Sequence, residues 1–169
     1  MEHAERRAVT GAGPFHICLI DLDRFKQIND TFGHAVGDIV LQTVATSIQA
    51  EVRGEDCVGR YGGEEFILLL TGSDGFRPEA LAERIRQRVA DLRFADAGAP
   101  EGVTVSIGIA AFCNGEGFSS TVSRADRALY AAKASGRNRV VSAAEAKTAC
   151  FAAHSGTASS SVDATSACL

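Results

Sequence analysis

The chain has 169 residues, of which 46% are hydrophobic and 22% are charged, and its formal net charge is −4. These values are typical of one soluble globular domain with its own core, and the negative balance argues against whole-surface attraction to nucleic acid or anionic lipid. No apolar run approaches the roughly 20 residues that cross a bilayer, and no apolar segment typical of a secretory signal follows the charged start. We therefore expect a cytoplasmic protein without a membrane span.

The first half of the chain begins with a strand and two helices. The apolar run Phe15–Asp21 predicts a buried strand. Residues 24–32 predict a short helix that Gly33 ends, and residues 38–53 predict a long helix that ends at Gly54. The apolar stripe expected on the long helix consists of Ile39, Val40, Val44, Ile48 and Val52.

A hairpin follows the long helix. Residues 57–61 and 65–71 predict two strands, because both runs are rich in residues that favour strands. The pair Gly62-Gly63 between them is typical of a hairpin turn.

The remaining elements alternate between helices and strands. Residues 77–92 predict a helix with Pro78 in its first turn, residues 102–112 a strand, residues 119–137 a helix and residues 138–142 a short strand. The complete order is βααββαβαβ. This order predicts the α+β class, with a central mixed, largely antiparallel sheet flanked by helices.

The ends of the chain differ in composition from its middle. Residues 15–141 carry the periodic elements and form the predicted domain, while residues 1–14 are interpreted as an N-terminal helix remnant or linker. Residues 142–169 are rich in Ala, Ser and Thr and lack periodicity, so we interpret them as a low-complexity, disordered tail. The five cysteines show no C-x-x-C spacing of the kind that marks a metal site.

Four separated segments carry the chemistry. They are DLDRFKQINDTFGHAVGD (21–38), RYGGEEF (60–66), SIGIA (106–110) and ADRALYAAKASGRNRV (125–140). Together they resemble the GGDEF family of diguanylate cyclases, over a stretch from about Phe15 to Val141. The resemblance implies a fold like that of nucleotide cyclases and polymerase palms, and an enzyme that condenses two GTP into cyclic di-GMP.

A magnesium site is the first implication of this resemblance. Asp21 and Glu64 would bind the metal, with the backbone carbonyl of Leu22 as a further ligand, and manganese is an alternative ion. Hard oxygen donors of this kind are what magnesium prefers. Glu64 is also the candidate base for the attacking 3′-hydroxyl. Glu65 is expected either to reach a second magnesium or to support the turn, since neighbouring side chains of an extended chain point to opposite faces.

The substrate residues implied by the family fall into two sets. Asn29 and Asp38 would recognise guanine, because their oxygens accept from its N–H groups, and His34 also matches the substrate-site pattern. Three basic residues (Lys26, Lys133 and Arg137) would bind the phosphates, with Lys26 stabilising charge in the transition state.

Simpler structural interpretations compete at several of these positions. Asn29 could be a turn residue, Asp38 an N-cap of the long helix, and His34 a packing or capping residue. Asp23 is given no catalytic role, because a cap for the following helix explains it equally well.

The hairpin glycines have a proposed task of their own. Gly62 and Gly63 permit a positive φ and leave no Cβ between the backbone and a phosphate. We therefore include both in the predicted substrate site.

A second, inhibitory site is also implied. Arg53 and Asp56 form an Arg-x-x-Asp motif at the family's position for binding cyclic di-GMP, and Arg84 matches a second arginine of that site. A surface ion pair is the ordinary alternative for such a motif. The resemblance predicts that the product inhibits its own synthesis.

The reaction implied by the resemblance needs two facing copies of the domain, because one domain offers one GTP site. The family's opening Asp-x-Leu-Thr-Gly-Leu segment and its usual N-terminal regulatory domain are missing, so we interpret the chain as an excised catalytic domain. A binding module that senses GTP or cyclic di-GMP without synthesis is the second hypothesis. An adenylyl cyclase or polymerase palm is the third, although Asn29 and Asp38 suit guanine rather than adenine.

Overall fold

The computed structural model describes residues 15–72, 76–94, 100–113 and 116–144. The predicted linker 1–14 and most of the predicted tail 142–169 lie outside the described residues. The elements are, in chain order, β1 (Phe15–Leu22), α2 (Phe25–Phe32), α3 (His34–Gln49), β2 (Cys57–Arg60), β3 (Glu65–Thr71), α4 (Pro78–Ala90), β4 (Val105–Ala111), α5 (Phe118–Ala134) and β5 (Val140–Ser142).

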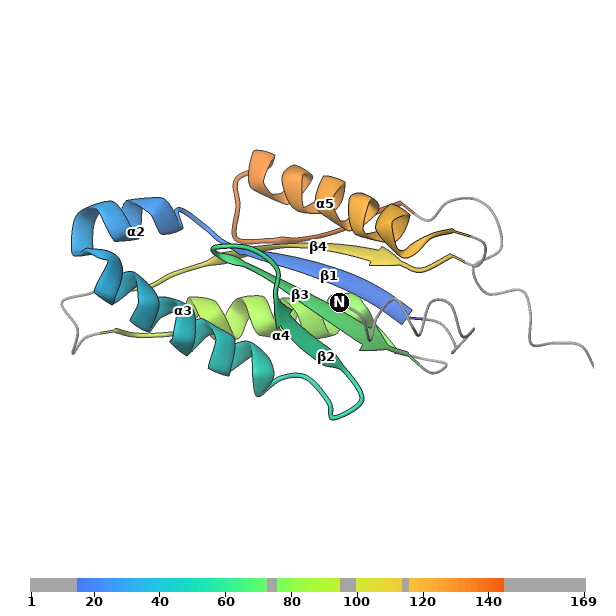
Figure 1. Cartoon of the computed structure of the whole chain (residues 1–169), viewed down its shortest axis with the longest axis horizontal. Helices are drawn as coiled ribbons and strands as arrows, with labels where there is room; N and C mark the ends of the chain where they lie inside the picture. Colours follow the sequence, from blue (N-terminus) through green and yellow to red (C-terminus); the bar gives the residue numbers. More distant parts are fainter. Residues whose placement is uncertain (1–14, 73–75, 95–99, 114–115, 145–169) are drawn as a thin grey trace, which may run out of the picture.

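One five-stranded sheet organises the domain, with strand order β2-β3-β1-β4-β5. The central strand β1 pairs antiparallel with both β3 and β4, β2 pairs antiparallel with β3, and β5 pairs parallel with β4. Figure 1 shows the strands running side by side with helices on both sides of them. The predicted α+β class with a mixed, largely antiparallel sheet is confirmed.

The two faces of the sheet carry separate cores. On β1, Ile17 and Leu19 belong to a smaller cluster that includes α5 residues such as Leu129. The alternate residues Cys18 and Ile20 belong to a larger cluster that takes in buried residues of α3 and α4. This division follows from the two-residue period of a strand, which sends successive side chains to opposite faces. Helix α5 therefore covers one face and helices α3 and α4 cover the other (Figure 1).

The contact between α5 and β4 depends on Gly108. A Cβ at this position would lie 2.2 Å from the carbonyl oxygen of Ala125 and 2.3 Å from the backbone nitrogen of Leu129. Because both atoms belong to the helix backbone, no side-chain rearrangement could make room. Gly108 thus sets how closely α5 lies on the sheet.

The long helix differs from the prediction at both ends. Helix α3 begins at His34, its N-cap is Gly33 with φ 86°, and it ends at Gln49, well before Gly54. Asp38 lies inside the helix, so the N-cap interpretation of Asp38 is wrong. Ile39 is 47% exposed and was wrongly placed in the buried stripe, whereas Val40 is fully buried. Gly33 does end the short helix α2, as predicted.

Among the described residues, the longest helices are too short or too polar to traverse a lipid bilayer.

Candidate functional site

The end of β1 lies beside the hairpin that carries the glutamates. Asp21 is paired with Glu65 in the antiparallel ladder of β1 and β3. The backbone N–H of Leu22 donates to the carbonyl oxygen of Glu64 at 3.3 Å. Directly opposite residues of an antiparallel pair carry their side chains on the same face. Asp21 and Glu65 therefore share one face at this end of the sheet, and Glu64 directly precedes Glu65 in the chain.

Lys133 provides the positive charge nearest to Asp21. Its Nζ lies 2.7 Å from Oδ2 of Asp21, whose side chain is 9% exposed. Burial raises the pKa of Asp21 above its ordinary value, and the hydrogen bond from Lys133 together with the charges of Lys133 and Arg137 opposes this rise. The last turn of α5 thus places cationic groups against a buried carboxylate at the sheet end.

Gly62 leaves room for a carboxylate, and the carbonyls of both hairpin glycines accept from an arginine. A Cβ on Gly62 would lie 2.6 Å from Oε2 of Glu65, whereas a Cβ on Gly63 would meet nothing within 4 Å. Arg60 donates from Nη2 to the carbonyl oxygen of Gly63 at 2.6 Å and from Nε to that of Gly62 at 3.2 Å. Within the described residues the positive-φ glycines are Gly33 and Gly136, so neither hairpin glycine uses the positive φ that was expected of it.

Asn29 carries an unsatisfied acceptor. Its Oδ1 is buried and has no hydrogen-bond partner among the described residues. A Cβ on Gly37 would lie only 1.9 Å from this oxygen, so Asn29 occupies the space that a side chain at position 37 would need. Buried polar atoms are nearly always paired, so an unpaired acceptor is a candidate contact for a ligand.

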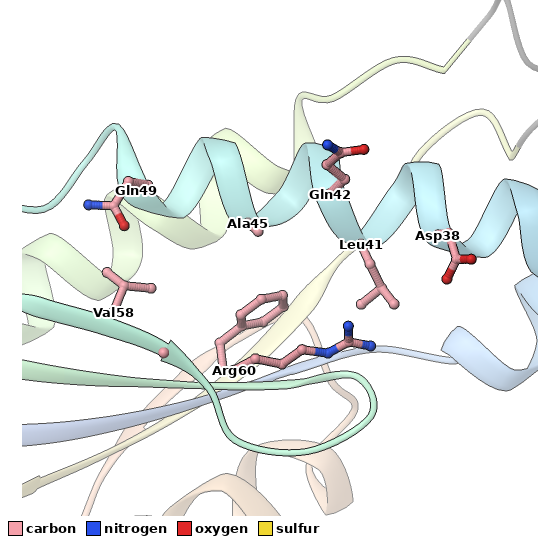
Figure 2. A pocket seen from close by; sticks show the side chains of 9 residues that line it. Asp38, Leu41, Gln42, Ala45, Gln49, Val58 and Arg60 are labelled. Carbon is pink, nitrogen blue, oxygen red and sulfur yellow. The ribbon is translucent and has the colours of Figure 1, made fainter. Parts of the chain in front are cut away.

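A cleft of about 500 Å³ separates α3 from the hairpin strands (Figure 2). Asp38, Leu41 and other α3 residues line one side, and Arg60 with residues of β2 and β3 lines the other. Figure 2 shows the Asp38 and Leu41 side chains pointing into the cleft toward the guanidinium of Arg60. Its volume falls within the usual range for small-molecule sites.

The other predicted substrate residues lie at exposed positions around these groups. Lys26 is in the first turn of α2 and His34 is the first residue of α3. Both side chains are exposed, as are Asp38 and Arg137. The structure places Asn29 of α2 against Gly37 of α3, which precedes Asp38 in the chain, and it brings Asp21, Glu65 and Lys133 together at the sheet end.

The acidic residues at the sheet end fit a divalent cation that is completed by a nucleotide. No group of three or more His, Cys, Asp or Glu side chains gathers to hold an ion by itself in the described part of the chain. A buried carboxylate opposite a second one offers hard oxygen donors, and magnesium commonly takes one or two carboxylates and fills its shell with phosphate oxygens and water.

Asp56 of the predicted inhibitory site is already engaged. Its carboxylate is 7% exposed and accepts from the backbone N–H of Arg53 at 3.1 Å and from that of Thr71 at 3.0 Å. It thus fixes the turn between α3 and β2 to the end of β3. The role of Asp56 in this structure is to stabilise the fold, because the two backbone N–H groups would lose their buried acceptor without it.

The two arginines of that predicted site present different environments. The guanidinium of Arg53 lies 5.3 Å from the centre of the Phe76 ring, and 58% of its side chain is exposed. Arg84 is held by Glu51, with Nε 2.5 Å from Oε2 and Nη2 3.1 Å from the carbonyl oxygen of the same residue. Arg88 also pairs with Glu51, at 3.0 Å. Arg53 also forms a long, exposed ion pair with Glu55 at 3.9 Å, whereas Glu51 holds Arg84 closely. An exposed pair of this length leaves the Arg53 guanidinium accessible to an anion.

Sequence reasoning missed the tasks of three residues. Asp23 does not cap α2, since the N-cap position is Arg24 and carries no side-chain cap bond. Its carboxylate instead accepts from the hydroxyls of Thr104 and Ser106, both at 2.7 Å. Arg60 and Gly37 were given no role, although Arg60 directly precedes the Tyr-Gly-Gly turn and Gly37 directly precedes Asp38. The only indication in the sequence that Arg60 and Gly37 have a role was their position next to predicted site residues.

The fold and this site together define a member of one family. The family model described as "Diguanylate cyclase, GGDEF domain" matches residues 1–139. The chain therefore belongs to the GGDEF family, and the predicted resemblance is confirmed.

Relatives with names and solved structures agree with this assignment. Diguanylate cyclase A of Treponema denticola is 48% identical over 125 residues, which cover 73% of this chain and 34% of that protein. Response regulator PleD of Caulobacter vibrioides is 45% identical over 140 residues, covering 80% of this chain and 31% of PleD. The chain thus spans about a third of the length of these curated relatives.

The solved structures are isolated domains of similar size. The GGDEF domain of DgcB from Caulobacter crescentus, in complex with c-di-GMP, superposes with a TM-score of 0.76 at 35% identity and covers 83% of this chain and 84% of that one. The active GGEEF domain of a diguanylate cyclase from Vibrio cholerae gives 0.75 at 36% identity, covering 85% and 92%. Its motif is the one found here at residues 62–66.

Proposed function

We propose that this chain is a diguanylate cyclase that condenses two GTP into cyclic di-GMP and two pyrophosphates with a divalent cation. The observation that carries the proposal is the placement of Asp21 opposite Glu65, with Glu64 beside them and Lys133 paired to Asp21. Carboxylates and a lysine at one sheet end suit a metal-bound triphosphate. Membership of a family whose named relatives are diguanylate cyclases supports the same conclusion.

The guanine end of the substrate is assigned to the α2–α3 region. The unpaired Oδ1 of Asn29 and the exposed carboxylate of Asp38 both accept hydrogen bonds, and guanine offers N1–H and an exocyclic amine as donors. Adenine would leave such acceptors unpaired, at a cost of about 1–3 kcal/mol per group. This preference for guanine also argues against the adenylyl cyclase alternative.

The chain's own residues have distinct roles in the proposed reaction. The 3′-oxygen of one GTP forms a bond to the α-phosphorus of the other while the bond to the leaving pyrophosphate breaks, and Glu64 accepts the hydroxyl proton. The step then repeats in the opposite sense to close the ring. Lys26, Lys133 and Arg137 balance negative charge on the phosphates. Magnesium, held by Asp21, Glu64, Glu65 and the Leu22 carbonyl, would neutralise phosphate charge and lower the pKa of the attacking hydroxyl.

The experiment that tests this function is a turnover assay. Purified protein is incubated with GTP and magnesium, and the products are separated by chromatography. We expect cyclic di-GMP and pyrophosphate in a ratio of one to two, and no product with ATP. Binding of GTP without any cyclic di-GMP would instead favour the non-catalytic binding module.

Product inhibition is a second part of the proposal. Arg53, Asp56 and Arg84 are assigned to a site for cyclic di-GMP, and the exposed Arg53 guanidinium supports this. Arg53→Ala should weaken binding of cyclic di-GMP in calorimetry, and unchanged affinity would remove Arg53 from the site. Glu51→Gln should strengthen binding roughly two- to fivefold, because it releases Arg84 from an exposed ion pair of modest strength.

A further inference from the structure

A left-handed turn follows helix α5. Gly136, Arg137 and Asn138 have φ angles of 114°, 61° and 47°. Two consecutive residues other than glycine in the left-handed region are unusual, because Cβ crowds the carbonyl oxygen in this conformation. Such a conformation persists only where the surrounding structure holds it, and such turns cluster at functional sites.

Two hydrogen bonds from outside the turn hold it at Asn138. Its backbone N–H donates to Oδ2 of Asp23 at 3.0 Å, and Nη1 of Arg86 donates to its side-chain Oδ1 at 2.6 Å. Asp23 and Asn138 are 115 positions apart in the chain. The conformation of the turn is therefore a tertiary property, set by α4 and by Asp23 just after β1 rather than by α5 alone.

The Asp23 carboxylate is itself fixed from a third direction. Oδ2 also accepts from the Thr104 hydroxyl and Oδ1 accepts from the Ser106 hydroxyl, both at 2.7 Å. The backbone N–H of Asp23 donates to the carbonyl oxygen of Thr104 at 2.9 Å. With only 7% of the residue exposed, both carboxylate oxygens serve as internal acceptors rather than as ligands turned to solvent.

The turn presents Arg137 to the end of the sheet that bears Asp21. Lys133, one helical turn before Arg137, is ion-paired to Asp21 at 2.7 Å, and the Arg137 charge also acts on Asp21. Arg137 is exposed and makes no side-chain hydrogen bond or ion pair within the described part of the chain. The backbone sets the position and starting direction of this side chain, and that backbone is held at Asn138.

We infer that Asp23 is a positioning residue for the triphosphate: its carboxylate holds the 136–138 turn so that the Arg137 guanidinium points at the phosphates. The inference deepens the proposed function and rests on it. Asp23 touches neither substrate nor metal in this scheme and acts through Arg137.

Charge and positioning predict opposite effects of a change at Asp23. Removing a negative charge near a phosphate site should strengthen binding of an anionic nucleotide. Removing the acceptor for Asn138 should weaken it. Asp23→Asn separates the two, because its amide oxygen can still accept from Asn138 and its amide nitrogen can donate to the Ser106 hydroxyl. Asp23→Ala removes both the charge and the acceptor.

The test is a double-mutant cycle with Arg137→Ala, read by calorimetric binding of a non-reacting GTP analogue with a methylene bridge between the α and β phosphates, with and without magnesium. We expect Asp23→Ala to weaken binding about tenfold in the wild-type background and less than twofold in the Arg137→Ala background. The affinity of Asp23→Asn for the analogue should be no less than about half that of the wild type, both with and without magnesium. Asn138→Ala removes the hydrogen bond from Arg86 and leaves the Asp23 carboxylate intact. We expect it to weaken binding in the wild-type background and much less in the Arg137→Ala background, as Asp23→Ala does. With this second variant the test does not depend on the folding of Asp23→Ala.

Three results would overturn the inference. The first is an equal loss from Asp23→Ala in both backgrounds, and the second is no loss at all. The third is a loss from Asp23→Asn as large as that from Asp23→Ala, which would indicate that the charge or a metal contact matters instead. If the wild-type protein bound no analogue, both the proposed function and the inference would be wrong. If the wild type bound it but the losses from Asp23→Ala and Arg137→Ala were additive, only the inference would be wrong.

Discussion

At the scale of single residues, Asn29 and Gly37 form the most sharply defined contact of the substrate site. The Asn29 side chain occupies the space over Gly37, where a Cβ would lie 1.9 Å from Oδ1. This oxygen is at the end of a side chain that can rotate, so a Cβ at position 37 would displace it without disrupting the helix. The absence of a side chain at position 37 therefore leaves room for Asn29 at the position where we propose that it binds guanine.

Gly37→Ala should weaken GTP binding about tenfold while changing stability little, because the helical preference for alanine offsets a tight 3.2 Å approach to Phe25 Cζ. The loss reflects displacement of Asn29, and alanine inside a helix is favoured over glycine by about 0.5–1 kcal/mol. Calorimetry with GTP and thermal unfolding measure the two effects. Gly54→Ala is the matched control, because a Cβ there meets nothing within 4 Å. Unchanged GTP affinity in Gly37→Ala would contradict the assignment of Asn29.

The residue scale also shows where local pattern reasoning failed. Asp23 precedes a helix and was interpreted as its cap, yet its partners Thr104, Ser106 and Asn138 are 81, 83 and 115 positions away. A single sequence carries no signal for partners at such separations. The family resemblance, by contrast, correctly brought the segments of Asp21 and Glu64 together, because the family's architecture implies that β1 lies beside the hairpin.

At the scale of elements, the position of α5 on β4 determines where Lys133 lies. Gly108→Ala should destabilise the fold by about 1–3 kcal/mol, because its Cβ would collide with the α5 backbone. It should also raise the Michaelis constant for GTP by moving Lys133 and Arg137. Urea unfolding and initial rates measure the two effects.

Gly59→Ala on β2 is the control, since its Cβ would meet only Ile67 Cγ2 at an ordinary 3.7 Å. Equal stability of the Gly108 and Gly59 variants would show that α5 is not held by this close approach.

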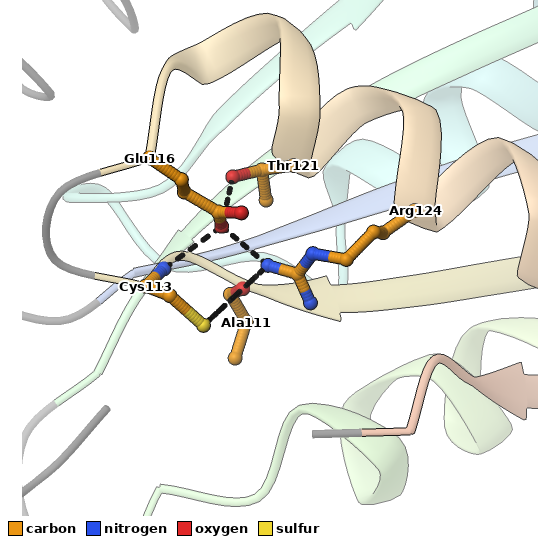
Figure 3. Close-up of polar contacts among 5 residues, drawn as sticks. All are labelled: Ala111, Cys113, Glu116, Thr121 and Arg124. Atoms are coloured by element: carbon orange, nitrogen blue, oxygen red, sulfur yellow. Dashed lines mark hydrogen bonds and ion pairs between the residues drawn. The ribbon is translucent and has the colours of Figure 1, made fainter. Parts of the chain in front are cut away.

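The start of α5 is secured by a cluster around Glu116 (Figure 3). Its Oε1 accepts from the Thr121 hydroxyl at 2.6 Å, from the Cys113 backbone N–H at 2.9 Å and from Arg124. Burial works against the ionised form, but the hydrogen bonds from Arg124, Thr121 and Cys113 outweigh it, so the pKa of Glu116 lies below its ordinary value of 4.5. Because Arg124 also donates to the Ala111 carbonyl, the cluster joins the end of β4 to α5.

Glu116→Gln should lower the free energy of unfolding by about 1–3 kcal/mol at pH 7. A group with a depressed folded pKa stabilises above its unfolded pKa, and this contribution disappears as the pH falls through the folded value. The difference between wild type and variant should therefore shrink progressively below about pH 4.5, the ordinary value for Glu. Urea unfolding at several pH values measures it, with the exposed Glu101→Gln as control. A difference that stayed constant with pH would exclude the ionised cluster as its cause.

Element boundaries were harder to predict than element types. The α+β class and the hairpin followed from periodicity and from Gly62-Gly63, but α3 begins four residues before its predicted start. Residues 34–37 include a glycine, which disfavours a helix locally, yet they form the first turn of α3, where Gly37 leaves room for Asn29. Gly54 was expected to end α3 and instead lies in the turn tied by Asp56.

At the scale of the whole molecule, we assign one GTP site to each copy of the domain. The proposed reaction joins two GTP molecules, so two copies must face each other. Specific activity should therefore rise with protein concentration and level off where sedimentation shows a dimer. Constant specific activity at concentrations where only monomer sediments would contradict the two-copy scheme.

The central claim is that the ends of β1 and β3 hold a divalent ion against a guanosine triphosphate. Electron paramagnetic resonance of Mn²⁺, titrated into protein saturated with the non-reacting GTP analogue, measures that contact most directly. We predict that Asp21→Asn and Glu64→Gln each weaken Mn²⁺ binding at least tenfold, while the exposed Asp126→Asn leaves it unchanged. Equal Mn²⁺ affinity in wild type and both site variants would contradict the claim.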